Sequence, residues 1–508
     1  MIGRLIIGDI RPSTPDFEHP AKATVGSQVS VRADVFKDGH EKLAVFVKWC
    51  SDAEGDWRSV RMTPVANDRW EGFICPQTLG LHSFEIIAGT DRYATWRNEV
   101  LIKYEAGQNI DVELIEGSLM LGEACLWDAS ATMADAAEPV KTRLESGIRA
   151  GIAEFFESHM SFDDETSSTQ LKLWVDRPAA SYGAWYEFFP RSEGGFGGAT
   201  LRLDAIAKMG FDIVYLPPIH PIGKVERKGR NNTIIAGPDD PGSPWAIAGH
   251  TDIHADLGTF DDFDRFVERA NDLGMEIALD YALQCAADHP WLVSHPDWFH
   301  HRPDGTIKFA ENPPKKYQDI YPINFWPPSN DARIELWAEC KQILEFWMSH
   351  GVRIFRVDNP HTKPLAFWEW LIAEIHAIDP GVIFLAEAFT RPKMMAQLAQ
   401  VGFSQSYTYF TWRTKKKHIT SYFDEVARGR ASDYMRPNFW PNTPDILSGP
   451  LRNGGPGAFK QRLVLAATGS SAYGIYSGYE LCENEPASDD NEEYLHSEKY
   501  EIKHRDWD

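Results

Sequence analysis

Apolar and polar positions alternate in short runs through the first hundred residues. VSVRADVF (29–36), AVFVKWC (44–50), WEGFICP (70–76) and SFEIIAG (83–89) are separated by turns rich in Gly, Pro, Asp and Asn. A period of two is typical of strands with one buried face, and several such runs favour two packed sheets. We therefore predict an N-terminal β-sandwich over residues 1–108.

The pattern then changes to a helical period. PVKTRLESGIRAGIAEFFESHM (139–160) carries apolar residues three and four positions apart, and LKLWVDRP (171–178) returns to strand-like alternation. We predict a helical insertion over 109–168, followed by a return strand and linker over 169–181. The insertion has more apolar positions than short helices bury by themselves, so we expect it to form a homodimer interface. These positions are Leu114, Leu119, Leu121, Leu126, Ile148, Ile152, Phe155 and Phe156.

From Tyr182 to Asp508, short apolar runs alternate with helical patterns. Eight such runs are separated by seven helical patterns, which predicts an α/β fold, a (β/α)8 TIM barrel over 182–508. The segment 284–331 is too long for a simple connection, and we predict an inserted loop domain there. The eight expected strands are 184–190, 212–218, 276–283, 352–358, 382–389, 404–410, 434–441 and 472–478.

Composition narrows the functional classes. The net charge of −23 argues against nucleic acid and anionic membranes as partners, because both require a basic surface. No apolar run approaches the roughly 20 residues that cross a bilayer, and the N-terminus lacks the features of a signal peptide. The six cysteines form no CxxC pair, which indicates reduced thiols in the cytoplasm, with neither a disulfide framework nor a zinc site.

Four carboxylates fall at or just beyond the C-terminal ends of predicted barrel strands, where such barrels carry their active sites. They are Asp280, Asp358, Glu387 and Asp445. Any one of them alone could be a structural hydrogen-bond acceptor. Because buried carboxylates are costly, four at one end of a barrel indicate a site.

Arg356 and Asp358 lie two residues apart in one strand and so share a face. The arginine is placed to keep Asp358 ionised, as a nucleophile requires. Glu387 lies in the apolar run FLAEAF, which favours a raised pKa and proton donation. This pair suits retaining chemistry at an anomeric carbon. The alternative for Arg356 and Asp358 is a structural ion pair that closes the barrel.

Four segments resemble the motif regions of the α-amylase superfamily, glycoside hydrolase family 13. They are ALDYALQCAADHP (278–290), GVRIFRVDNPHTKP (351–364), FLAEAF (384–389) and NFWPNTPDIL (438–447). The resemblance implies that Asp358 is the nucleophile, Glu387 the general acid/base, and Asp445 a third carboxylate that binds sugar hydroxyls. Gln284-Cys285 and Thr443-Pro444 replace the usual Asn-His and His, which removes two sugar-binding histidines and a calcium ligand. No metal and no cofactor is therefore expected.

Further segments resemble one subfamily, the α-1,4-glucan:maltose-1-phosphate maltosyltransferases. They include WYEFFPRS (185–192), LPPIHPIGK (216–224), ENPPKKYQDIYPINF (311–325) and SEKYEIKHRDWD (497–508). The subfamily continues into a last barrel helix and a C-terminal β-sandwich, so we expect both to be missing here. The resemblance implies a donor-phosphate site of Asn312, Lys315, Tyr317 and Asn359. It implies maltosyl contacts from Lys224, Gln284, Lys499 and Tyr500, with Arg356 as the motif arginine.

These observations predict a retaining maltosyltransferase of bacterial glycogen synthesis. It would move maltosyl from α-maltose 1-phosphate to the non-reducing end of an α-1,4-glucan, through a β-maltosyl ester on Asp358, and release inorganic phosphate. Two alternatives stay open: an α-glucan hydrolase of the same superfamily, and an inactive, truncated glucan-binding homologue. A hydrolase has no use for the phosphate-binding set, and the intact carboxylates argue against an inactive protein.

Overall fold

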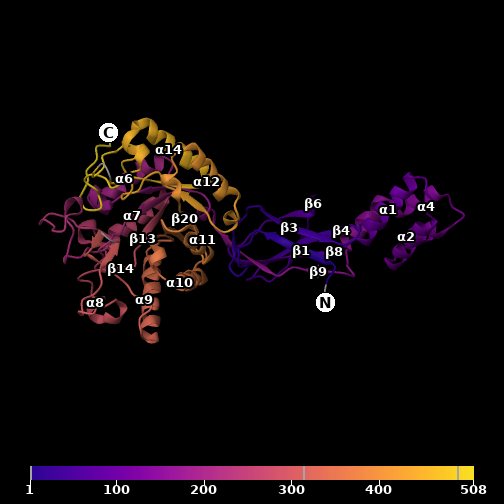
Figure 1. The fold of residues 1–508 in the computed structure, drawn as a ribbon, viewed down its shortest axis with the longest axis horizontal. Helices are drawn as coiled ribbons and strands as arrows, with labels where there is room; N and C mark the ends of the chain where they lie inside the picture. The colour runs from indigo at the N-terminus through magenta and orange to yellow at the C-terminus, as the bar shows by residue number, and fades with distance from the viewer. Residues whose placement is uncertain (1–2, 313–314, 489–490, 508) are drawn as a thin grey trace. The chain divides into compact units, whose positions relative to one another are not determined.

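The computed structural model describes residues 3–312, 315–488 and 491–507. By its internal contacts the chain divides into two compact units. The first comprises Met1–Ser13 with Gly26–Trp174, and the second comprises Thr14–Val25 with Val175–Asp508. Figure 1 shows strands and a helical cluster in the first unit and a barrel surrounded by helices in the second.

The first unit contains the predicted sandwich. In β3, Val31, Ala33 and Val35 are buried and alternate with more exposed residues, so one face of the strand packs into the interior. One sheet has the order β1 (Leu5–Arg11), β3 (Val29–Lys37), β7 (Arg69–Ile74), β6 (Thr63–Ala66). The other has the order β10 (Leu171–Asp176), β8 (Gly80–Thr90), β4 (Leu43–Ser51), β5 (Arg58–Arg61), with β9 (Thr166–Ser167) also paired to β8.

The helical insertion begins earlier than predicted. Helix α1 starts at Arg92, well before the expected boundary at 109, because Asp91 ends the strand and caps the helix by accepting from the Ala94 N–H. The helices form their own core, in which Leu114, Leu121 and Ile152 are buried, so these three positions are not available to an interface. The helices of the insertion after α1 are α2 (Asp111–Glu123), α3 (Trp127–Ala134), α4 (Val140–Ile148) and α5 (Ala150–Ser158).

The second unit confirms the barrel. Eight parallel strands close in chain order, and β11 pairs with β22 to complete the ring. Large aromatic side chains such as Trp185, Tyr215 and Trp440 fill the interior, so it is a packed core. The strands are β11 (Gly183–Glu187), β12 (Ile213–Leu216), β13 (Glu276–Tyr281), β18 (Ile354–Asp358), β19 (Ile383–Glu387), β20 (Gln405–Tyr407), β21 (Pro437–Phe439) and β22 (Ala472–Tyr476).

Helices cover the outside of the barrel between successive strands (Figure 1). All seven predicted helical patterns form helices. The apolar faces of six of them join the largest hydrophobic cluster, and the helix Lys416–Arg428 packs in a separate cluster with Phe410 and Phe439. These helices are α6 (Phe196–Lys208), α7 (Phe260–Asp272), α9 (Asn330–Ser349), α10 (Leu365–Ile378), α11 (Pro392–Gln400), α12 (Lys416–Arg428) and α14 (Gly455–Gly469). The shorter α13 (Gly449–Asn453) precedes α14.

The predicted inserted loop domain contains its own short elements. They are β14 (Gln284–Ala286), α8 (Trp291–Ser294), β15 (Ala310–Asn312), β16 (Lys315–Tyr317) and β17 (Ile320–Pro322). Strands β14 and β17 pair with each other, as do β15 and β16. One further strand of the second unit, β2 (Ala21–Thr24), comes from the N-terminal part of the chain.

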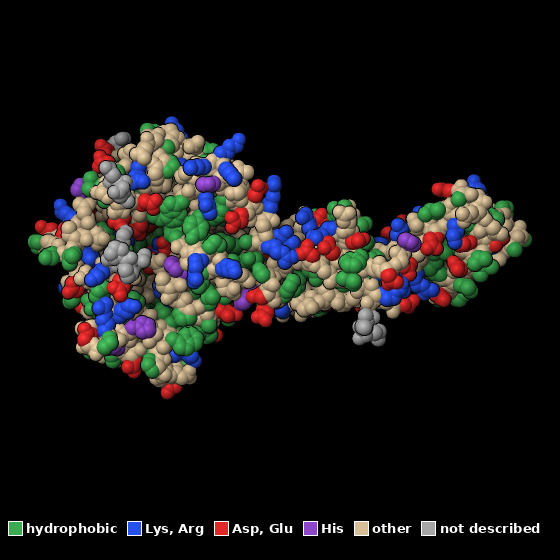
Figure 2. All heavy atoms as spheres, in the orientation of Figure 1, with side chains coloured by type: hydrophobic (Ala, Val, Ile, Leu, Met, Phe, Trp, Pro, Cys, Tyr) green, Lys and Arg blue, Asp and Glu red, His purple; other side chains and the backbone are tan. Residues whose placement is uncertain are grey.

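Surface charge and helix character add two observations. On the face drawn in Figure 2, acidic and basic side chains are interspersed over each unit, so the net charge of −23 is distributed. Within the described part of the chain, no helix has both the length and the apolar character to cross a membrane.

Candidate active site

Asp358 is the last residue of β18, and Arg356 lies two residues earlier on the same face. Arg356 Nη1 lies 2.9 Å from Asp358 Oδ1 and 2.8 Å from Asp280 Oδ2, and all three side chains are buried. Burial by itself would raise the pKa of Asp358, but the charges of Arg356 and Lys363 outweigh it and hold that pKa below its usual value. Asp358 is therefore an ionised carboxylate in a water-poor setting.

Glu387 ends the neighbouring strand β19 and is the register partner of Asp358. Its Oε1 lies 3.7 Å from Arg356 Nη2, and its Oε2 accepts a hydrogen bond of 3.1 Å from the Asn359 N–H. Burial raises the pKa of Glu387 to about 7; Arg356 opposes this shift, and the negative charge of Asp358 adds to it. Near neutral pH, Glu387 can both donate and accept a proton.

Asp445 lies in the turn after β21, where the Thr443 hydroxyl accepts from its backbone N–H at 3.3 Å. Its side chain is about 45% exposed, and its Oδ1 lies 2.9 Å from Lys499 Nζ. Lys499 belongs to the segment after β22, and its Nζ also lies 5.1 Å from the centroid of the Trp245 ring. This later segment therefore supplies a cation to the third carboxylate.

The fourth predicted carboxylate, Asp280, has a supporting position beneath the other three. Its Oδ2 accepts hydrogen bonds from the Tyr215 hydroxyl at 2.5 Å and from Trp245 Nε1 at 3.3 Å, in addition to the contact with Arg356. The side chain of Asp280 has no exposed area. It therefore fixes the arginine rather than facing a substrate.

The other three carboxylates, Asp358, Glu387 and Asp445, line a cavity of about 750 Å³ at the C-terminal end of the barrel strands. Eight of the predicted site residues border it: Gln284, Tyr317, Arg356, Asp358, Asn359, Glu387, Asp445 and Lys499. The other walls come from the inserted loop domain, including Phe309 and Ile320. Carboxylates, two amides and two cations thus meet in one hollow, where they can form hydrogen bonds to a polar ligand.

The remaining predicted residues lie elsewhere. The Lys224 side chain is exposed and does not border the cavity. Tyr500 is buried and borders a second cavity of about 520 Å³, which shares Tyr317 with the first. Asn312 and Lys315 pair across β15 and β16, but their side chains lie outside the described part of the structure.

Two residues that support the site, Lys363 and Glu498, were not among those predicted from the sequence. Lys363 borders the cavity, and its Nζ donates to the backbone oxygens of Asp358 and Asn359. Glu498, next to Lys499, is buried and accepts from the Tyr476 hydroxyl at 2.5 Å, which attaches the segment after β22 to the barrel. Lys363 carried a usable signal, since a lysine within a few residues of a nucleophile is a candidate counter-charge. Glu498 carried none.

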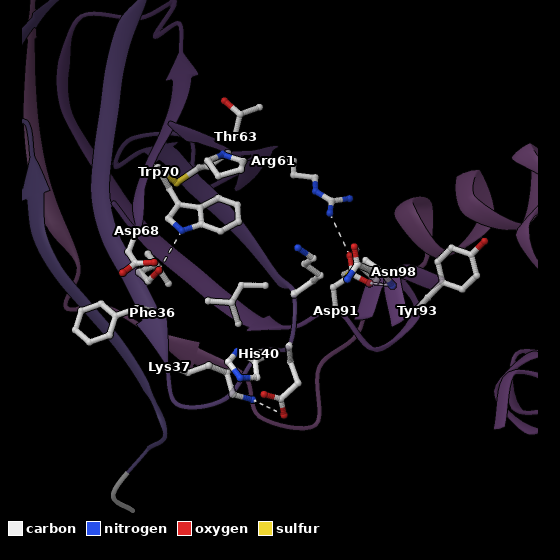
Figure 3. Close-up of a pocket in the computed structure, with 18 of the residues that line it drawn as sticks. Phe36, Lys37, His40, Arg61, Thr63, Asp68, Trp70, Asp91, Tyr93 and Asn98 are labelled. Atoms are coloured by element: carbon white, nitrogen blue, oxygen red, sulfur yellow. Dashed lines mark hydrogen bonds and ion pairs between the residues drawn. The ribbon is translucent and has the colours of Figure 1, made fainter. Parts of the chain in front are cut away.

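A larger cavity, of about 990 Å³, lies in the first unit between the sandwich and the helical insertion. Figure 3 shows Trp70 and Phe36 on its strand side and Tyr93 and Asn98 on its helix side, with Arg61 directed toward Asp91. Its principal charges are already paired, for example Arg61 with Asp91 at 3.1 Å. It contains none of the predicted catalytic residues, so the smaller cavity in the barrel is the candidate active site.

The described residues contain no group of three or more His, Cys, Asp or Glu side chains arranged to hold a metal ion. At the position where an amylase-type calcium ligand is usual, the chain has Gln284, whose Nε2 donates to the Trp245 carbonyl at 3.2 Å. The amide nitrogen of Gln284 is therefore engaged in joining two loops.

Fold and site together define a catalytic barrel of the α-amylase type. Residues 158–364 match the family model "Alpha amylase, catalytic domain", and residues 3–177 match "Alpha-1,4-glucan:maltose-1-phosphate maltosyltransferase, domain N/S". The protein of that name numbered 2 in Streptomyces coelicolor is 52% identical, over 100% of this chain and 78% of its own length. The Rhodospirillum rubrum protein is 47% identical, over 99% and 78%. The chain therefore belongs to the α-1,4-glucan:maltose-1-phosphate maltosyltransferase family, which are glycosyltransferases.

Among solved structures, an α-amylase from Lactobacillus plantarum is similar at 22% identity and a TM-score of 0.48, over 62% of this chain and 76% of that one. The closed ring of eight parallel strands, rather than this likeness, carries the fold assignment.

Proposed function

We propose that this chain transfers a maltosyl unit from α-maltose 1-phosphate to the non-reducing end of an α-1,4-glucan, with retention of the anomeric configuration. The observation that carries the proposal is the placement of Asp358 and Glu387 side by side at the ends of neighbouring strands, in one cavity, where the pKa of Asp358 is lowered and that of Glu387 is raised to about 7. One ionised and one protonated carboxyl group are what a double displacement at an anomeric carbon requires. The names of the relatives support the choice of donor and acceptor.

In the first step, an oxygen of Asp358 attacks the anomeric carbon of the donor. Its Oδ2 is the candidate, since Oδ1 accepts a hydrogen bond of 2.9 Å from Arg356, whereas the Asn359 amide lies farther from Oδ2, at 3.4 Å. The bond from that carbon to the phosphate oxygen breaks, Glu387 supplies a proton to the departing phosphate, and a β-maltosyl ester forms.

In the second step, Glu387 removes the proton from the 4-hydroxyl of the glucan. The hydroxyl oxygen attacks the anomeric carbon, the ester bond to Asp358 breaks, and an α-1,4 bond forms. Two inversions give net retention. Asp445, held by Lys499, is placed to accept hydrogen bonds from the sugar hydroxyls.

The test measures phosphate and glucan together. With α-maltose 1-phosphate and a malto-oligosaccharide, each phosphate released should accompany one acceptor lengthened by two glucose units. Reducing sugar released from glucan alone, without phosphate, would identify a hydrolase. Absence of both products, with glucan still bound, would identify a non-catalytic homologue.

The predicted phosphate contact at Lys315 gives a second test of donor class. A charge-assisted hydrogen bond contributes roughly 1.5–3 kcal/mol, so Lys315→Ala should lower kcat/KM for α-maltose 1-phosphate by about tenfold to a hundredfold. The loss should be smaller with maltosyl fluoride, whose leaving group is small. Lys316→Ala, at the exposed neighbouring lysine, is the matched control. Equal losses with both donors would make Lys315 structural.

We also propose a homodimer formed through the helical insertion. Helix α2 exposes Val112, Ile115 and Leu119 on one face, and Trp127 of α3 is exposed as well. Ile115→Glu with Leu119→Glu should give a monomer in sedimentation. Leu201→Glu, at an equally apolar and exposed position of α6, should leave the assembly unchanged. A dimer that survives the double change would contradict this interface.

A role in glycogen synthesis in the cytoplasm completes the proposal. All six cysteines are free, and Cys285 and Cys340 are both buried, as is typical of proteins in a reducing compartment. The acidic surface suits a soluble substrate better than a nucleic acid.

A further inference from the structure

The residue after the nucleophile has an unusual backbone conformation. Asn359 has φ +44° and ψ +53°, in the left-handed region that residues with side chains seldom adopt. In this conformation its N–H reaches Glu387 Oε2 at 3.1 Å, while its side-chain amide lies 3.4 Å from Asp358 Oδ2. One residue thus contacts both carboxylates, so its backbone conformation bears on the position of each.

Lys363 is the group that holds the turn from beneath. Its Nζ donates to the Asp358 carbonyl at 3.0 Å and to the Asn359 carbonyl at 3.3 Å, and the residue is only 9% exposed. Two neutral donors complete the turn: the Thr362 hydroxyl bonds to the Asn359 carbonyl at 2.7 Å, and Trp368 Nε1 to the Pro360 carbonyl at 2.8 Å.

The positive charge of Lys363 requires an explanation. Neutral donors already serve the same turn, and burial of an ammonium group is costly, so geometry alone gives no reason for a lysine. Burial lowers the pKa of Lys363, and the surrounding carboxylates oppose that shift. The charged and titratable groups that face it are Asp358, Glu387, Asp280, Arg356 and His361.

We propose that Lys363 is a positioning residue that locks Asn359 in its left-handed conformation and acts as a second counter-charge to the nucleophile. It touches no reacting atom. Its hydrogen bonds hold the backbone of residues 358 and 359, so that the Asn359 N–H can donate to Glu387. Its positive charge also lies beside Asp358. The catalytic part of this inference rests on the proposed maltosyl transfer, whereas the structural part does not.

The chain offers a matched control in Lys22. Its Nζ also donates to two backbone carbonyls, those of Ala399, at 2.8 Å, and Phe403. Burial lowers the pKa of Lys22 to about 7, and the residue does not border the active-site cavity. Lys22→Met therefore removes a lysine of the same bonding pattern without touching the site.

The first experiment is a pH profile of kcat/KM with maltosyl fluoride for the wild type and for Lys363→Met, Lys363→Arg, Thr362→Val and Lys22→Met. Lys363→Met should lose roughly tenfold to a hundredfold in kcat/KM at pH 7. The acid limb of its profile, where activity falls at low pH as Asp358 becomes protonated, should move to higher pH. The reason is that Asp358 loses a neighbouring positive charge, which makes it easier to protonate. Lys363→Arg should keep the limb in place.

The two remaining variants separate charge from hydrogen bonding. Thr362→Val removes a hydrogen bond from the same turn and no charge, so its acid limb should not move. Lys22→Met should lower thermal stability and leave the profile unchanged. An unshifted limb in Lys363→Met, or an equal shift in Thr362→Val, would overturn the electrostatic role.

The second experiment does not depend on activity. Amide hydrogen exchange in peptides covering residues 358–363 should be faster in Lys363→Met than in the wild type, and less so in Lys363→Arg. In Lys22→Met, exchange in these peptides should be unchanged, and the faster exchange should instead occur in residues 399–403. Unchanged exchange in Lys363→Met would overturn the positioning role. An inactive wild type would refute the proposed function while leaving this measurement decisive for Lys363.

Discussion

Asp358 and Glu387 end neighbouring strands, β18 and β19, pair in register and share one arginine, yet they favour opposite protonation states. The Arg356 guanidinium nitrogens lie 2.9 Å from a carboxylate oxygen of Asp358 and farther, 3.7 Å, from one of Glu387. With an effective dielectric constant of about 20, this difference in distance corresponds to about 1 kcal/mol of attraction. Lys363 adds a second cation on the Asp358 side, where its Nζ bonds to the Asp358 carbonyl. Similar positions thus acquire different chemistry from the placement of two cations.

The largest expected effect is the loss of the ionised member of the pair. Asp358→Ala should lower maltosyl transfer by roughly 10⁴-fold or more, because it removes the group that forms the ester on which both steps of the proposed reaction depend. Transfer is measured as phosphate release with labelled glucan. Asp319→Ala, at a buried aspartate outside the cavity lining, is the control for folding. A variant that retained more than a trace of transfer would show that Asp358 is not the nucleophile.

Loss of the protonated member should divide the reaction into its two steps. In Glu387→Ala the ester can still form, since phosphate leaves without full protonation, but the acceptor hydroxyl lacks its base. Turnover should fall by roughly 10²- to 10⁴-fold. Intact mass spectrometry after addition of donor should show one added maltosyl unit, which the double variant with Asp358→Ala should lack. An unmodified mass in the single variant would contradict this role.

The comparison can also be tested by removing the shared arginine. Arg356→Met leaves Asp358, Glu387 and Asp280 without their common cation, so Asp358 should become harder to ionise and more like Glu387. We expect a loss of about 10²-fold in kcat/KM at pH 7, with the acid limb moved to higher pH. Arg356→Lys keeps the charge and should lose less. Equal losses in both variants would mean that the shape of the guanidinium matters and its charge does not.

The pairing of strand ends was predictable from sequence, whereas the contacts made by distant segments were not. Asp358 and Glu387 each follow an apolar run of the barrel pattern. Their place at the C-terminal ends of the strands could therefore be predicted from the neighbouring residues in sequence. Lys499 reaches Asp445 only because Glu498 bonds to Tyr476, and no local pattern encodes that. The early start of α1 was missed because the preceding strand and the helix adjoin at a single capping residue, Asp91.

The fold of the inserted loop domain could not be predicted from sequence for the same reason, since it depends on contacts between distant segments. Its short strands form three residue pairs each, too few for periodicity to reveal. Strands β14 and β17 are positioned by pairing across a long separation, as between Gln284 and Pro322. The composition of this loop predicted a functional segment, and Gln284 and Tyr317 do border the cavity. Which of its side chains reach the cavity depends on those pairings. Lys224 lies in another connection, after β12, and no local pattern indicated that its side chain is exposed.

The smallest effect concerns the pH dependence of ester formation in the unmodified protein. Asp358, with its lowered pKa, stays ionised through the neutral range. Burial raises the pKa of both Glu387 and Asp280 to about 7, and of these two only Glu387 borders the cavity, so we expect the alkaline limb to belong to Glu387. Its proton is present below that value and is lost as pH rises through it. With maltosyl fluoride, which does not titrate in this range, kcat/KM should fall above pH 7 and level off at the rate that the Glu387→Ala variant retains. The Glu387→Ala variant, measured by single-turnover mass spectrometry, should form the ester at a rate independent of pH between about 6 and 9. A surviving alkaline limb in that variant would assign the titration to another group and remove the basis for contrasting the two strand ends.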